Sequence, residues 1–136
     1  MKHNITATHD KNLSFSAQID SYVVRMDTTD EATIHAGPSP KKLLLAGLAG
    51  CTGIDVVSIL NKMKVPFQQL QIDISASLTE EHPKIYHDVQ ILFTVAVAVA
   101  DKPKFEKAVN LSKDKYCGVS AMFGHFAMLN WEIKYL

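Results

Sequence analysis

The chain has 136 residues, 47% of them hydrophobic and 21% charged, which is the size and composition of one domain with a hydrophobic core. Its 14 basic residues balance 14 acidic ones, and Arg25 is the single arginine, so the sequence favours neither a nucleic-acid partner nor an anionic membrane surface. Two cysteines are too few for a disulfide framework and, with no signal-like apolar run at the start of the sequence, they indicate a cytoplasmic protein.

Short strands are predicted at the start of the chain. Apolar and polar residues alternate over residues 13–19, which is the period of a half-buried strand. Breaks at residues 9–12 and 20–21 divide this region into about three strands, the last of which includes residues 23–26. Residues 27–35 are polar and without period, so we expect a strand meander followed by a loop.

A long helix is predicted over residues 41–62, and at about 1.5 Å per residue it would be roughly 33 Å long. One stripe of this helix carries Leu44, Leu48, Cys51, Asp55 and Ser58. Another carries Gly47, Gly50 and Gly53, each costing about 1 kcal/mol relative to alanine, which indicates close approach of another backbone. Because apolar residues nearly surround it, the helix should be buried in the fold or in a dimer interface; its polar residues argue against a membrane span.

The second half of the chain predicts a hairpin, two helices and a last strand. Period-2 alternation over residues 70–78 and 85–99 indicates an antiparallel pair. Asp101 and Pro103 open a helix that extends to about residue 115, and a short helix follows Cys117. Residues 127–135 alternate again. The fold class is therefore α+β, an antiparallel sheet with a long buried central helix, in a single domain over residues 1–136.

The two cysteines occupy different predicted environments. Cys117 lies in the first turn of a helix, where the dipole lowers the pKa of a thiol, whereas burial in the middle of a helix raises the pKa of Cys51. Both could equally be small buried hydrophobic residues, since free cysteine is among the most buried residue types. The six histidines lack ligand spacing and no C-x-x-C is present, so no zinc site is expected.

Two segments together resemble the OsmC/Ohr family. Residues 37–57 read GPSPKKLLLAGLAGCTGIDVV, similar to the family's S-P-x-x-L-L-L…G-C-T signature, and residues 116–120 read YCGVS, similar to its second cysteine motif with Gly118 in place of proline. The resemblance implies an intertwined homodimer that reduces organic hydroperoxides without a metal or organic cofactor. It makes Cys51 the peroxidatic thiolate and Cys117 the resolving thiol, with a dithiol reductant reopening their disulfide.

The activating groups depart from the family pattern, in which an arginine of the N-terminal hairpin pairs with a glutamate at the start of the helix. Lys41 or Lys42 stands at the glutamate's place. Candidate cations for Cys51 are Arg25, which could instead be an exposed strand residue, and Lys11. Asp55, one turn beyond Cys51, would oppose a thiolate unless a cation intervenes; a buried aspartate bonding to the partner chain is the alternative.

The missing Arg/Glu pair leaves a second function open. A member of this family that has lost efficient peroxidase chemistry would serve as a stress-response accessory or as a binder of a small hydrophobic ligand. The two retained cysteines favour the enzyme, and the lost pair favours the binder.

Overall fold

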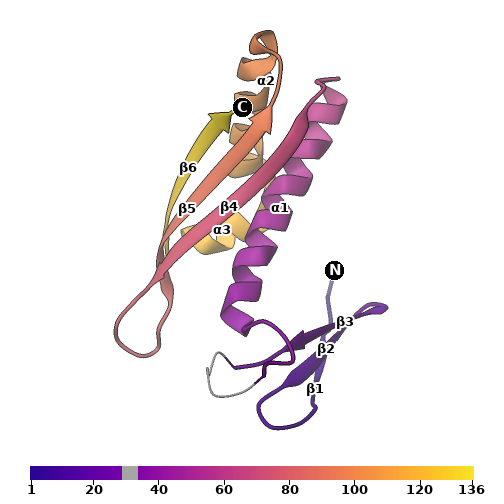
Figure 1. The fold of residues 1–136 in the computed structure, drawn as a ribbon, viewed down its shortest axis with the longest axis vertical. Helices are drawn as coiled ribbons and strands as arrows, with labels where there is room; N and C mark the ends of the chain where they lie inside the picture. The colour runs from indigo at the N-terminus through magenta and orange to yellow at the C-terminus, as the bar shows by residue number, and fades with distance from the viewer. Residues whose placement is uncertain (29–33) are drawn as a thin grey trace. The chain divides into compact units, whose positions relative to one another are not determined.

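The computed structural model describes residues 1–28 and 34–136, which form two compact units, Met1–Leu45 and Ala46–Leu136. The first unit holds one sheet and the start of the long helix; the second holds the rest of that helix, the other sheet and the remaining helices (Figure 1). The expected loop over residues 27–35 falls partly on residues 29–33, which lie outside the described residues.

The first unit contains the three predicted strands, β1 (Thr6–His9), β2 (Phe15–Ile19) and β3 (Tyr22–Met26), which pair as an antiparallel meander. The alternating apolar residues of β2 are only partly buried. Ala17 is buried, whereas Phe15 and Ile19 stay 41% and 38% exposed. Gly37 lies so close to the carbonyl of Arg25 that a β-carbon would overlap it, which explains the glycine at this turn.

Helix α1 (Pro40–Lys62) confirms the predicted long helix. It begins in the manner that a Ser-Pro pair favours: Pro40 is its first residue, and the Ser39 hydroxyl accepts the Lys42 N–H at 3.4 Å. It ends where Lys64 takes a positive φ of 57° before Val65 and Pro66.

The buried face of α1 differs from the predicted stripe. The fully buried residues are spaced by four, namely Leu48, Thr52, Val56 and Leu60, whereas Leu44 is 55% exposed and Ser58 is also exposed. Thr52 tolerates burial because its hydroxyl donates to the carbonyls of Leu48 and Ala49, both at 3.1 Å. Several other apolar residues of α1 are not buried within the chain, so a dimer interface stays a possible location for them.

The sheet of the second unit is mixed. Strands β4 (Gln68–Leu78) and β5 (Tyr86–Ala96) form the predicted antiparallel hairpin. The last strand, β6 (Met128–Tyr135), pairs parallel to β5 and in this respect departs from the antiparallel sheet that was expected. A parallel pair needs a crossover of a dozen or more residues, which the helices between β5 and β6 supply. The strand predicted to reach residue 99 ends at Ala96, and a register shift near Leu78 buries Tyr86 and exposes His87.

The crossover consists of η1 (Val99–Asp101), α2 (Lys102–Leu111), a π-helical turn η2 (Ser112–Tyr116) and α3 (Gly118–Gly124). Asp101 forms no side-chain cap, contrary to the prediction; its carboxylate instead pairs with Lys104 at 3.8 Å. The core joins this crossover to the sheet, because the ring of Phe93 on β5 stacks on Trp131 at 6.0 Å and meets the edge of Phe105 at 6.4 Å.

Candidate functional site

The two cysteines meet in the second unit. Cys51 comes from the middle of α1 and Cys117 from the residue that precedes α3, and both are free thiols. Their Sγ atoms and a carboxylate oxygen of Asp55 all lie within 4.8 Å of one another. The structure therefore brings together three of the five residues singled out in the sequence, from segments far apart along the chain.

The π-helical turn η2 delivers Cys117 to this cluster. The Cys117 N–H donates to the carbonyl of Ser112 at 2.8 Å, a wider closure than an α-helical turn, after which the chain becomes extended at Cys117 and α3 begins. Ser112 is fully buried, and its hydroxyl donates to the Asp55 carboxylate at 3.2 Å. One residue thus holds both Asp55 and the backbone of Cys117.

Both sulfur atoms accept backbone N–H groups from the start of α3. The Ser120 N–H donates to Cys117 Sγ at 3.3 Å, and the Val119 N–H donates to Cys51 Sγ. The bond from Val119 favours the charged form of the Cys51 thiol and so acts to lower its pKa. The predicted position of Cys117 at a helix start is confirmed, with the sulfur as the cap of α3.

The pKa of Cys51 is nonetheless raised above that of an ordinary thiol. Burial is the largest cause, followed by the hydrogen bond of the Cys51 thiol to Cys117, and the charge of Asp55 adds to the increase. The Val119 N–H opposes these effects without cancelling them. The expectation that burial beside Asp55 raises the pKa of Cys51 is confirmed.

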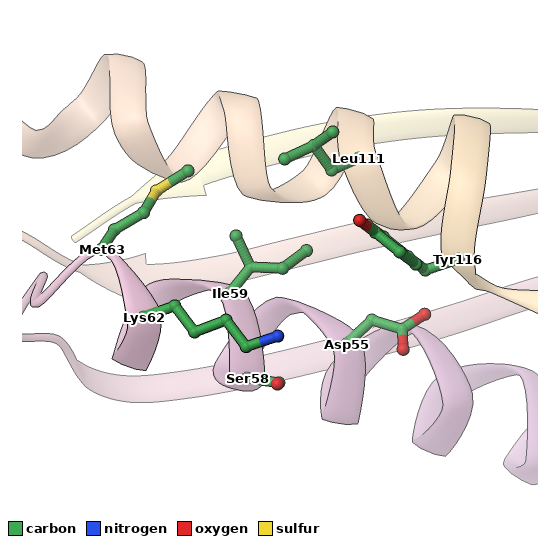
Figure 2. Close-up of a pocket in the computed structure, with 7 residues that line it drawn as sticks. All are labelled: Asp55, Ser58, Ile59, Lys62, Met63, Leu111 and Tyr116. Atoms are coloured by element: carbon green, nitrogen blue, oxygen red, sulfur yellow. The ribbon is translucent and has the colours of Figure 1, made fainter.

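A cavity of about 300 Å³ adjoins the cluster on the side of Asp55. Figure 2 shows its walls: Asp55, Ser58, Ile59 and Lys62 lie on α1, and Leu111 and Tyr116 lie on the neighbouring helical segment. Most of the wall is apolar, while Asp55 and Lys62 supply opposite charges. The cavity could hold a small molecule with an apolar part, and Asp55 is the residue that it shares with the sulfur cluster.

Sequence reasoning missed Ser112, Lys62 and Tyr116. Lys62 follows Asp55 by seven residues, a spacing that puts both on one face of a helix and could have signalled the cavity. Ser112 carries no comparable signal, because the π-helical turn that directs it to Asp55 has no recognisable sequence pattern. His125 is exposed just after α3.

Arg25 and Lys11, the candidate cations, belong to the first unit. Arg25 pairs with Asp10 at 3.8 Å between partly exposed side chains, and Lys11 is exposed. The exposed arginine with a surface partner fits the structural alternative given for it. A role for either cation at Cys51 stays a prediction.

Comparison with known proteins identifies the family. The OsmC-like protein family matches residues 17–132, which is most of the chain. The chain belongs to the OsmC-like protein family. The resemblance drawn from the two cysteine motifs is thereby confirmed.

Three known proteins show how similar the chain is to others in sequence and in structure. It is 33% identical to protein YhfA of Escherichia coli K12 over 85 residues, which are 62% of this chain and 63% of that protein, so the match leaves over a third of YhfA uncovered. Among solved structures, the OsmC-like protein of Mycoplasma pneumoniae superposes with a TM-score of 0.87 at 15% identity, covering 100% of this chain and 98% of that one. The organic hydroperoxide resistance protein OhrB of Bacillus subtilis gives 0.66 at 18% identity, with 98% of both chains covered. These two structures confirm the fold.

The raised pKa predicts how Cys51 reacts with an alkylating reagent. In a Cys117→Ser background, which keeps a hydroxyl near Cys51, the rate of Cys51 alkylation should rise only at a pH above that for free cysteine. Adding Asp55→Asn should move the profile to lower pH, because a negative charge that disfavours the thiolate is removed. The profile is measured by mass spectrometry of the Cys51 peptide. Asp73→Asn, an exposed carboxylate on β4, is the control and should leave the profile unchanged; an unchanged profile in Asp55→Asn would contradict the assigned cause.

Proposed function

We propose that this OsmC-like protein is a thiol-dependent peroxidase that reduces organic hydroperoxides in the cytoplasm as a defence against oxidative stress. The observation that carries the proposal is the meeting of Cys51 and Cys117, whose sulfur atoms lie within 4.8 Å although the residues come from α1 and from the start of α3. A disulfide holds its two sulfurs at roughly 2.05 Å, so the two side chains must move closer together during the reaction. Family membership and the hydroperoxide named for the Bacillus relative add support.

The reaction uses the two thiols in turn. The thiolate of Cys51 attacks the distal oxygen of the hydroperoxide, the O–O bond breaks, and the alkoxide leaves as an alcohol after taking a proton, so Cys51 becomes a sulfenic acid. The thiol of Cys117 then displaces water from that sulfenic acid and forms the disulfide. A dithiol reductant reopens the disulfide by exchange and leaves in its own oxidised form.

Access favours Cys51 as the first nucleophile. Cys51 is half-buried, whereas Cys117 is only 3% exposed and its sulfur already accepts the Ser120 N–H. A buried nucleophile cannot meet a bulky hydroperoxide, so we assign the first attack to Cys51.

The cavity beside Asp55 suits the organic part of the substrate. Ile59, Met63 and Leu111 offer apolar contacts, and Asp55 links this wall to both sulfur atoms. A hydroperoxide with a hydrocarbon group could bury that group here while its O–O bond points to Cys51. The same cavity would also serve a binder of a small hydrophobic ligand, which is the alternative function.

Titration with cumene hydroperoxide separates the enzyme from the binder. The reduced wild type should lose two thiols per chain with one equivalent of peroxide, while Cys117→Ser should stop at a sulfenic acid that dimedone traps. Cys51→Ser should keep its thiol at the same peroxide concentration. If the wild type lost no thiols at a modest excess of peroxide, the peroxidase would be rejected in favour of the ligand binder. Trapping of a sulfenic acid at Cys117 in Cys51→Ser would reverse the proposed order of attack.

We further propose that the protein is a homodimer built on α1. A shallow groove along this helix is lined by Gly50, Gly53 and Ile54, and Ile54 is 72% exposed. A β-carbon added at Gly47 or Gly50 would meet no atom of the described residues within 4 Å, so that part of the chain supplies no reason for glycine at these positions. A partner backbone in this groove would supply one, and the family resemblance implies the same assembly.

A lipid bilayer is the alternative environment for the exposed apolar residues of α1. Its length and composition would suffice for a membrane span, with a hydropathy of 2.0 over its most apolar 18 residues, of which 22% are buried. The carboxylate of Asp55 and its bond to Ser112 in the middle of this length favour a protein partner instead.

The dimer is tested by sedimentation in buffer without detergent. At low micromolar concentration the wild type should sediment as a species of twice 15.1 kDa. An obligate interface buries on the order of 2,000 Å² or more, so such a dimer should not dissociate at this concentration. Gly50→Leu should shift the protein toward the monomer, and Asn110→Leu, on an exposed position of α2, should not. A well-folded wild-type monomer, or precipitation that only vesicles or detergent prevent, would contradict the proposed dimer.

A further inference from the structure

The sulfur cluster also has the composition of a metal site. Two sulfur atoms and one carboxylate oxygen, from Cys51, Cys117 and Asp55, lie within 4.8 Å of one another. Zinc binds cysteine sulfur at about 2.3 Å and carboxylate oxygen at about 2.0–2.2 Å, so two sulfur ligands in a tetrahedral site stand roughly 3.8 Å apart. The three atoms would need to close by at most about 1 Å to reach these distances.

The three ligands are held by partners of their own. The Asp55 carboxylate accepts the hydroxyl of buried Ser112 at 3.2 Å, which fixes its direction. Each sulfur accepts one backbone N–H, from Val119 at Cys51 and from Ser120 at Cys117. Metal ligands in proteins are commonly oriented by such bonds, and the orienting groups contribute 10- to 100-fold to metal affinity.

The arrangement along the chain also suits a metal. Cys51 and Asp55 are four residues apart on α1, the spacing at which one helix presents two ligands on the same face, as in H-E-x-x-H helices. Cys117 approaches from a second element. A search for C-x-x-C or histidine spacing cannot find a set that is assembled from two helices in this way.

The donor set selects the metal and the type of site. Thiolate ligands favour zinc over magnesium or calcium, which prefer oxygen. Three protein ligands leave one tetrahedral position, and the cavity beside Asp55 can supply a water molecule to it. A site with an open position exchanges its ion more readily than a closed structural site of four protein ligands.

We propose that the reduced protein binds one zinc ion through Cys51 Sγ, Cys117 Sγ and the Asp55 carboxylate, and that the ion and a hydroperoxide compete for the same two sulfur atoms. Zinc binding releases the two thiol protons. Oxidation reverses it: two zinc-bound thiolates, one hydroperoxide and two protons yield the disulfide, one alcohol, one water and the free zinc ion. The bound ion thus shields the thiols from oxidation, and peroxide releases zinc. This last step rests on the proposed peroxidase chemistry, while binding itself does not.

Zinc binding is measured by titrating the reduced, chelator-treated protein with zinc in competition with a chromophoric chelator. We expect one ion per chain and the release of two protons, and cobalt in place of zinc should give the absorption bands of a tetrahedral thiolate site. Cys117→Ser should weaken binding at least 100-fold. Ser112→Ala should weaken it 10- to 100-fold. Asp73→Asn is the matched control and should bind as the wild type does.

Two oxidants distinguish failure of the zinc site from failure of the peroxidase. Diamide, which makes the disulfide without peroxide chemistry, should expel the ion, and cumene hydroperoxide should expel it together with the loss of two thiols. Zinc release by diamide alone would keep the zinc site and reject the peroxidase. Zinc affinity that is equal in the reduced and the diamide-oxidised protein, or unchanged in Cys117→Ser, would overturn the proposed site.

Discussion

One buried residue, Ser112, contacts both segments that bring the two cysteines together. Its hydroxyl donates to the carboxylate of Asp55 on α1, and its carbonyl accepts the N–H of Cys117 at 2.8 Å. A π-helical turn makes both bonds compatible, because it widens the helix where α2 gives way to the cysteine. This link and the bond from the Val119 N–H to Cys51 both join the start of α3 to the middle of α1, where the two sulfur atoms meet.

Around that link the two thiols have opposite properties. Cys51 can be reached from outside, but burial, Cys117 and Asp55 raise its pKa, so little thiolate is present at neutral pH. Cys117 has the hydrogen bonds of a helix cap and is shielded from a bulky reagent. Such an asymmetric pair suits sequential chemistry, in which one thiol meets the substrate and the other waits to resolve. A positive charge brought near Cys51 by a partner chain would offset the effect of Asp55 on the pKa of this thiol.

Much of the fold follows from periodicity in the sequence. Alternation identified β2, β4, β5 and β6, while β1 and β3 were predicted only from the breaks at residues 9–12 and 20–21. The apolar run after Ser39-Pro40 identified α1 nearly to the residue. The direction of β6 could not be read from its own residues, because alternation is the same for parallel and antiparallel pairing. The buried row of α1 was misplaced for a similar reason: apolar residues nearly surround the helix, so periodicity does not select Val56 over Leu44. The cysteine pair was accessible through the two family motifs, whereas Ser112 acts through a turn whose geometry arises only in the folded chain.

The central claim is that Cys51 and Cys117 of one chain form a reversible disulfide. The most direct test is a non-reducing proteolytic digest of the peroxide-treated wild type, analysed by mass spectrometry beside a non-reducing gel. The proximity of the sulfur atoms predicts a Cys51–Cys117 linked peptide pair from a protein that migrates as a single chain, and its loss on treatment with a dithiol. Cross-linked dimers, or cysteines recovered as sulfinic acids without the linked peptides, would contradict it.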